Sequence, residues 1–158
     1  MKVVLAFYKQ KKNNIDKLIS FISRGYFTHC EIYIPEYNTS YSASKKDNNR
    51  VRQKNADEMN FNDKSKWTLI EFECMAVSVH LFLKYFKSVE NTPYSLSTII
   101  LIHLFRFPFK ISKNLICSEF CANGLNILLD LKPELKDTYK ESPTSLFTLL
   151  VANEIIKI

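Results

Sequence analysis

The stretch KNLICSEFCANGLNILL, residues 113–129, places Cys117 where a short apolar run becomes a helix. After this cysteine, apolar side chains recur at helical spacing, so one stripe of the helix faces a core. That stripe consists of Phe120, Cys121, Leu125, Leu128 and Leu129. Because the first-turn amides and the dipole of a helix favour an anion, they lower the pKa of a thiol placed there. The stretch therefore predicts a reactive thiol at Cys117, but it contains no base to take the thiol's proton.

The length and composition are those of a single folded domain. With 158 residues, 46% of them hydrophobic, the chain can bury a core of its own. Only two glycines and five prolines occur, which excludes collagen-like and low-complexity chains. We therefore expect one domain spanning residues 1–158.

The chain is basic, with 22 Lys and Arg residues against 16 Asp and Glu and a formal charge of +6. This excess would suit an anionic partner. Several of the lysines, however, lie in the polar segment 45–66, which lacks the aromatic interleaving of a single-strand binding platform. A solvated basic surface is the favoured interpretation, and nucleic acid is not an expected partner.

The sequence carries no sign of export or of membrane insertion. The amino terminus, MKVVLAFYKQKK, lacks a small-residue cleavage pattern and is typical of a strand rather than of a signal peptide. The longest apolar block, 96–105, falls well short of the roughly 20 residues that span a bilayer. Four cysteines occur without a CxxC pair, which indicates reduced thiols. We therefore expect no membrane span and a cytoplasmic location.

Periodicity and turn residues predict the order of the elements. Apolar, β-branched runs indicate strands over 2–8, 26–34, 38–44 and 67–75, with the second and third paired antiparallel. Helical spacing indicates a helix capped by Asn13 or Asn14 and ending near Arg24, and further helices over 77–89, 95–105, 117–129 and 144–153. The helix 95–105 is apolar nearly all round, and 55–66 is expected to be a surface loop. The outline is an α+β fold, a small antiparallel sheet packed against helices.

Three histidines could supply the missing base. His80 lies in an amphipathic helix and His103 in an apolar one, where a structural histidine is the commoner case. His29 lies on the strand 26–34 and shares a face with Glu31, while the alternate residues of the strand face the core. A lone histidine is more often structural than catalytic. The combination of a strand histidine with a cysteine at a helix start favours His29 as the base.

A metal site is the weaker interpretation of the cysteines. Cys117, Cys121 and His29 have suitable ligand atoms, but the sequence offers no fourth ligand at a familiar zinc spacing. Cys121, Cys30 and Cys74 are interpreted instead as small, buried apolar side chains. We therefore expect no metal and no cofactor.

Four short segments occur in an order and spacing that resemble the circularly permuted branch of the NlpC-type papain-like superfamily. In that branch the histidine strand precedes the cysteine helix, and its members include bacterial and phage cysteine peptidases and amidases, poxvirus relatives and, more distantly, lecithin:retinol acyltransferase-like enzymes. The segments are Thr28-His29-Cys30-Glu31, Tyr41-Ser42-Ala43-Ser44, Arg50-Val51-Arg52 and Cys117-Ser118-Glu119-Phe120. The resemblance implies a permuted papain-like fold and a phage or viral protein, located in the host cytoplasm if viral.

The resemblance also implies roles for individual residues. It makes Cys117 the nucleophile and His29 the general base. Family members orient the histidine with a polar residue on the neighbouring strand, here Ser42 or Ser44. Glu31 is preferred on chemical grounds, because a carboxylate holds the imidazole tautomer and stabilises the imidazolium better than a hydroxyl does.

Two positions depart from the family's pattern. Asn48 and Asn49 stand where similar sequences have a glycine-rich turn, and Ser95 follows Tyr94 where they have an acidic residue. At these two places the family's geometry does not carry over directly.

The expected function is hydrolysis of an amide, peptide or ester bond through a thioester on Cys117, whose backbone amide helps to form the oxyanion hole. Acyl transfer and deamidation would share that thioester, so the expected substrate is a peptide, amide or acyl compound. The alternative from another class is a non-catalytic viral binding module that keeps the fold and uses its basic surface.

Overall fold

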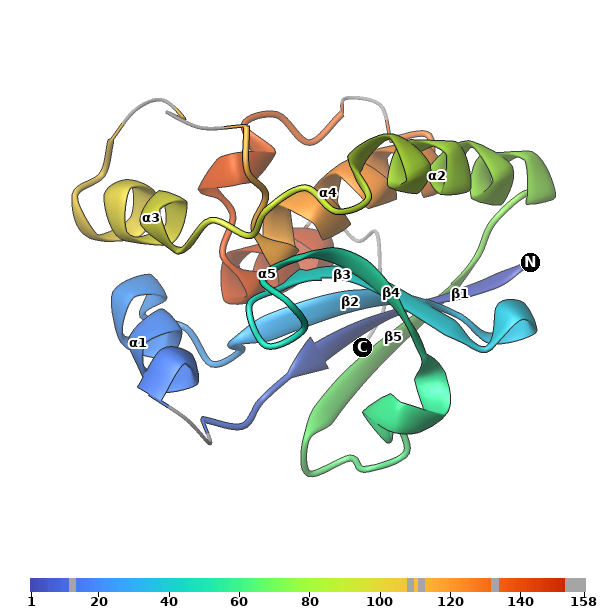
Figure 1. The fold of residues 1–158 in the computed structure, drawn as a ribbon. Coiled ribbons are helices and arrows are strands. Elements are labelled where there is room, and N and C mark those ends of the chain that lie inside the picture. Colours follow the sequence, from blue (N-terminus) through green and yellow to red (C-terminus); the bar gives the residue numbers. More distant parts are fainter. Residues whose placement is uncertain (12–13, 108–109, 111–112, 132–133, 153–158) are drawn as a thin grey trace.

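Five strands form one antiparallel sheet in the computed structural model, which describes residues 1–11, 14–107, 110, 113–131 and 134–152. The strands are β1 (Lys2–Tyr8), β2 (His29–Ile34), β3 (Thr39–Ser44), β4 (Arg50–Asn55) and β5 (Trp67–Glu73). Their order is β4-β3-β2-β1-β5, so the first strand of the chain lies inside the sheet (Figure 1). The predicted α+β class is confirmed, and so is the antiparallel pairing of β2 with β3.

The strands differ from the prediction in two places. Strand β2 begins at His29 rather than at Tyr26, because the Phe27 amide donates to the hydroxyl of Thr144 at 2.9 Å instead of to a neighbouring strand. The segment 50–55, which was not among the predicted strands, forms β4 and pairs with β3 along its length. The expected loop 55–66 includes a short 3-10 helix, Ala56–Met59.

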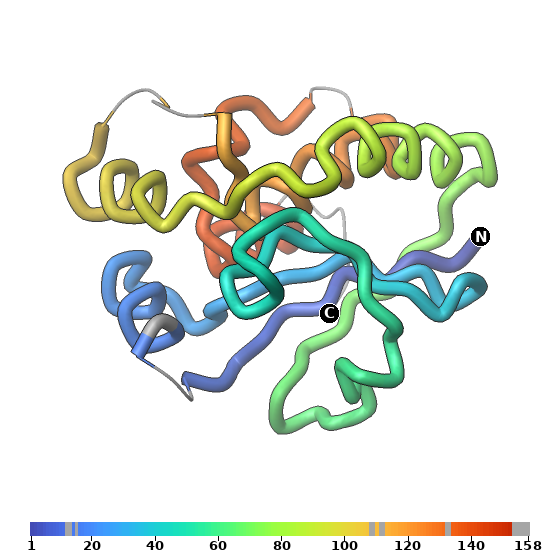
Figure 2. The backbone as a smooth tube through the Cα atoms, in the orientation of Figure 1, coloured from blue at the N-terminus to red at the C-terminus, as the bar shows by residue number. Residues whose placement is uncertain are grey.

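Helices cover one face of the sheet. They are α1 (Asn14–Ser23), α2 (Ala76–Val89), α3 (Leu96–Ile99), α4 (Cys117–Leu128) and α5 (Pro143–Ala152). Figure 1 shows α2, α4 and α5 over the same side of the sheet, and Figure 2 shows the chain passing from α2 to α3, which lies near α1 at one end of the molecule. The possible cap Asn13 and the expected helix end Asn153 lie outside the described residues.

The main core lies between these helices and the sheet. The face of β2 that was predicted to be apolar packs into it, with Cys30, Ile32 and Ile34 fully buried. Helix α4 approaches β2 closely because residue 124 is a glycine, and a Cβ there would lie 2.6 Å from Cδ1 of Ile32. This close packing fixes the position of α4 relative to β2.

The opposite face of the sheet carries a second, smaller cluster. Ala6 and Trp67 of the sheet pack there against Ala56 and Phe61 of the segment 55–66. This segment therefore covers part of a face that would otherwise meet water, and the charged residues described below lie beside it. The sheet is thus buried from both sides near the start of β2.

The predicted helix over 95–105 is helical over 96–104, but it is not buried on all sides as its apolar composition indicated. Helix α3 is followed by a single π-helical turn, Ile100–Leu104, whose wider spacing rotates its last residues out of the core. Leu104 and Phe105 are consequently exposed. Within the described ranges, no helix combines the length and the apolar character needed to cross a bilayer.

Candidate active site

Cys117 is the first residue of α4, and only 2% of its surface is exposed. The residue before it, Ile116, is extended, with φ −106° and ψ 162°. An isoleucine cannot cap the first-turn amides as a serine or an aspartate would. The sulfur therefore lies beside helix amides that receive no side-chain cap from Ile116.

His29 is the first residue of β2, and its Nε2 lies 3.0 Å from Oε1 of Glu31. Burial by itself lowers the pKa of this imidazole. Charge interactions and hydrogen bonding with Cys117, and then with Glu31, outweigh burial and raise the pKa from 6.5 to about 9. The structure thus brings together the thiol, the imidazole and the carboxylate that the sequence singled out.

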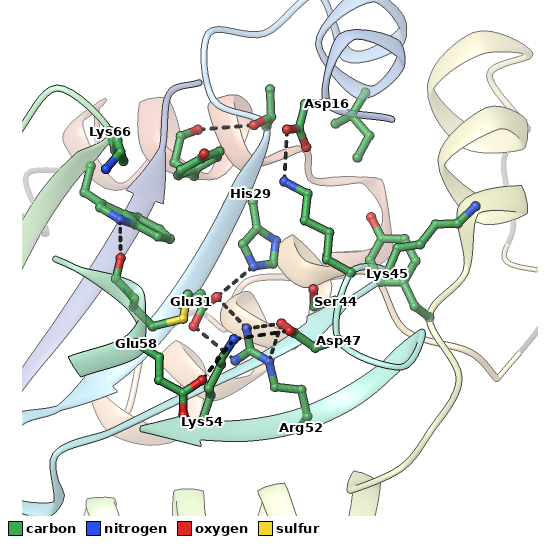
Figure 3. A pocket seen from close by; sticks show the side chains of 17 residues that line it. Asp16, His29, Glu31, Ser44, Lys45, Asp47, Arg52, Lys54, Glu58 and Lys66 are labelled. Carbon is green, nitrogen blue, oxygen red and sulfur yellow. Dashed lines mark hydrogen bonds and ion pairs between the residues drawn. The ribbon is translucent and has the colours of Figure 1, made fainter. Parts of the chain in front are cut away.

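Glu31 is held from its other side by Arg52. Nη2 of Arg52 donates to Oε1 of Glu31 at 2.7 Å and Nη1 donates to Oε2 at 3.1 Å, a bidentate pair that is almost completely buried. Burial raises the pKa of Glu31, but Arg52 first and His29 second outweigh it and lower the pKa to about 2. Figure 3 shows the carboxylate between the imidazole and the guanidinium.

Arg52 is in turn anchored by Asp47, whose Oδ2 accepts a hydrogen bond from Nε of Arg52 at 2.9 Å. Burial raises the pKa of Asp47, but Arg52 foremost, together with Lys54 and Ser44, keeps it below the ordinary value. Sequence reasoning quoted Arg52 within a motif but gave it no role. The signal that could have found it is Glu31 itself, because a buried carboxylate requires a cation.

The two serines proposed as orienting residues lie elsewhere in the hydrogen-bond network. Ser42 donates to the carbonyl oxygen of Cys30 at 2.7 Å. Ser42 of β3 pairs with Arg52 of β4 and lies on the same face of the sheet as Glu31 of β2. Because the Ser42 side chain is small, the Arg52 guanidinium can reach across β3 to Glu31. Ser44 lines the cavity described below, close to Asp47. Of the three proposed orienting residues, Glu31 is the one for which the structure gives a hydrogen bond to His29.

The turn between β3 and β4 is built by two asparagines. Asn48 and Asn49 have φ values of 58° and 57°, the left-handed conformation that asparagine tolerates better than most residues other than glycine. These two asparagines therefore hold a tight turn without glycine. This turn connects β3 to β4 and sets the register in which Arg52 faces Glu31.

The expectation that the helix start lowers the pKa of Cys117 is corrected by the surroundings of the sulfur. The pKa of Cys117 is raised well above the usual thiol value, first by hydrogen bonding with the Cys30 thiol and then by burial, while His29 opposes both. Cys30 lies on the core face of β2 and is fully buried. The Cys30 thiol and burial therefore disfavour the thiolate form of Cys117, and the interaction with His29 favours it.

Replacing Cys30 with alanine is expected to lower the pKa of Cys117, because it removes the largest cause of the raised value. Alkylation by iodoacetamide, followed at Cys117 by mass spectrometry over a pH series, should then reach half of its maximal rate at a lower pH. Cys121→Ala is the matched control, because Cys121 is as deeply buried as Cys30. This substitution should shift the pH profile of Cys117 alkylation less. An unchanged profile for Cys30→Ala would contradict the assigned cause.

A cavity of about 260 Å³ opens on the His29 side of the site (Figure 3). Lys46 donates to the buried Asp16 of α1 at 3.0 Å, and both residues line this cavity. Cys117 lines a much smaller cavity, of about 10 Å³, whose other walls include Ile99 of α3 and Pro143 of α5 as well as polar side chains. Ile19 of α1 lines both cavities.

The other two histidines are placed differently. His80 is exposed on α2. His103 lies in the π-helical turn and lines the small cavity with Cys117, and burial lowers its pKa. In the part of the chain that the structure describes, His29 is the histidine that interacts with both the thiol and a carboxylate.

No protein-family model matches the chain, and no curated protein matches it. The described residues also contain no group of three or more His, Cys, Asp or Glu side chains arranged to hold a metal ion. The geometry around Cys117 and His29 is therefore the basis on which a function can be proposed.

Proposed function

We propose that this chain is a thiol hydrolase of the permuted NlpC-type papain-like class, which cleaves an amide, peptide or ester bond. The observation that carries the proposal is that His29 interacts both with the Cys117 thiol and with the Glu31 carboxylate. The order of elements supports it, because the histidine strand β2 precedes the cysteine helix α4 and packs against it. The resemblance further suggests that the protein comes from a phage or a virus.

The proposed reaction begins when the Cys117 sulfur attacks the substrate's carbonyl carbon and His29 takes the thiol proton. The carbonyl oxygen becomes an oxyanion, which the first-turn amides of α4 would stabilise; the lack of a side-chain cap at Ile116 supports this role. His29 then gives its proton to the leaving amine or alcohol, and a thioester forms. Water, deprotonated by His29, attacks the thioester and releases the acid, which restores the thiol.

Glu31 and Arg52 serve this cycle by holding the imidazole. The imidazolium that forms during each half-reaction lies 3.0 Å from an ionised carboxylate, so its charge is stabilised at the moment it develops. Arg52 keeps that carboxylate ionised and fixed in position. Acyl transfer would follow the same route to the thioester, with an amine or alcohol in place of water.

The proposal is tested with para-nitrophenyl acetate, an activated ester whose leaving group is coloured. We expect a burst of nitrophenolate together with acetylation of Cys117, followed by slower release of acetate as the thioester is hydrolysed. Cys117→Ala should abolish the burst, whereas Cys121→Ala, a change of the same size at a buried position of the same helix, should keep it. Acetylation of Cys117 no faster than that of Cys74 would contradict the proposal.

A further inference from the structure

A basic hollow of about 750 Å³ lies outside the candidate active site, between α1 and the π-helical turn that follows α3. Four cationic side chains line it, those of Lys11, Lys17, Arg24 and Arg106. None of the described residues that line it is acidic. This composition differs from that of the cavity beside His29, where lysines and arginine alternate with carboxylates.

Exposed apolar side chains stand around this hollow. Phe21 of α1 is 78% exposed, and Leu104 and Phe105 are 50% and 63% exposed. Such side chains lose the stabilisation that burial would give them, and several of them together mark an interaction surface. Phe21 and Leu104 both line the hollow, and Figures 1 and 2 show α1 and α3 at the same end of the molecule.

The exposed side of α1 combines both kinds of residue at helical spacing. Lys17 and Phe21 lie four residues apart and so share one face of α1, and the exposed Leu18 lies beside them. Arg24 follows the helix directly and lines the same hollow as Lys17 and Phe21. The buried residues Ile19 and Ile22 lie on the other side of the helix and face the core. Helix α1 therefore presents a mixed cationic and apolar face to the solvent.

An anionic lipid surface is the partner whose chemistry fits this face. Lysine and arginine attract anionic headgroups, while phenylalanine and leucine side chains enter the boundary between headgroups and acyl chains. Single-stranded nucleic acid would use the aromatic rings for stacking, but it offers nothing apolar to the aliphatic Leu18 and Leu104. The protein's formal charge of +6 adds a long-range attraction of the same sign.

We propose that the face formed by Lys17, Phe21, Arg24, Leu104, Phe105 and Arg106, here called the docking face, binds the surface of an anionic membrane. The small cavity at Cys117 shares Ser23 and His103 with the hollow at the centre of this face. Docking would therefore bring the sulfur's own cavity to the membrane side of the molecule. The docking itself requires no catalytic step and is independent of the proposed function.

The test is co-sedimentation of the full chain with phosphatidylcholine vesicles that either contain or lack phosphatidylserine. We expect binding to the phosphatidylserine vesicles, which weakens as salt is added, and little binding to the neutral ones. Each cation near an anionic surface contributes about fivefold to binding, so Lys17→Glu with Arg106→Glu should weaken it by at least about twentyfold. Both side chains are exposed, and neither substitution touches the core.

The apolar part of the face is tested separately. Phe21→Ser with Phe105→Ser should weaken vesicle binding by about tenfold at constant net charge, because two exposed rings no longer enter the interface. The matched control for charge is Lys64→Glu with Lys84→Glu, and that for apolar surface is Met75→Ser with Leu81→Ser, all at exposed positions outside the docking face. Both controls should bind nearly as well as the unaltered protein.

Three outcomes would overturn the proposal. The first is that the unaltered protein fails to bind phosphatidylserine vesicles at low salt. The second is that the control variants lose as much binding as the variants of the docking face, which would show that binding does not depend on this particular face. The third is that single-stranded oligonucleotide binds more tightly than vesicles do and that the phenylalanine substitutions weaken this binding alone.

Discussion

Replacing His29 with glutamine is expected to slow the acetylation of Cys117 by para-nitrophenyl acetate by about a hundredfold to ten-thousandfold, which is what a positioned base contributes. Glutamine is similar in reach and can still donate a hydrogen bond to Glu31, but it cannot take the thiol proton. Since the pKa of Cys117 is already raised by Cys30 and by burial, very little thiolate is present without the base. The burst of nitrophenolate, followed by stopped-flow absorbance, measures the rate.

His103→Gln is the matched control, because His103 lines the small cavity with Cys117 but has no carboxylate partner among the described contacts that the structure gives it. It should keep the rate within a few-fold of the unaltered protein. The alkylation profile of Cys117 in His29→Gln should also move to higher pH, since the imidazole opposes the rise in the thiol's pKa. Equal losses in the two variants would show that His29 is not the base.

Much of this site follows from the two periodicities of the sequence. Alternation along 26–34 put His29 and Glu31 on one face and Cys30 on the other, and the structure has this arrangement. Helical spacing after Cys117 correctly gave a helix that begins at that residue. These features are local, since each depends on side-chain directions within a single element.

Other features depend on how elements meet, and the sequence did not predict them. Arg52 reaches Glu31 because β4 pairs with β3 in one particular register, which the turn at Asn48 and Asn49 sets. The raised pKa of Cys117 depends on a thiol from β2 that lies far away in the sequence. A helix-dipole argument considers one element alone, and it therefore missed a neighbour with a larger effect.

The ion pair of Glu31 and Arg52 also connects the site to the stability of the fold. Arg52→Met is expected to destabilise the protein by about 3–5 kcal/mol, because it leaves a buried carboxylate without its cation. Methionine keeps much of the apolar stem, so the loss is mainly one of charge. Arg50→Met is the matched control on the same strand, because the Arg50 guanidinium donates to the exposed Asn91 side chain at 3.0 Å. This substitution should cost less than about 1 kcal/mol. Urea unfolding measures both.

The cost of Arg52→Met should depend on pH with a defined sign. Burial raises the pKa of Glu31, but Arg52 and then His29 lower it from 4.5 to about 2, so the stability that Glu31 contributes is fully present above pH 4.5 and is lost as the pH falls through 2. Without Arg52 the effect of burial is opposed less, the pKa of Glu31 rises, and the carboxyl group takes up a proton more readily. The difference in the free energy of unfolding between the unaltered protein and Arg52→Met should therefore narrow as the pH falls from neutrality toward 2.

A second substitution separates the charge effect from simple loss of packing. Glu31→Gln combined with Arg52→Met removes both charges, so no unpaired carboxylate remains buried, and the double variant should be more stable at neutral pH than Arg52→Met alone. Its unfolding free energy should also vary less with pH in the acid range, since the group that titrates there has been removed. If the double variant were less stable than Arg52→Met at neutral pH, packing rather than charge would explain the loss.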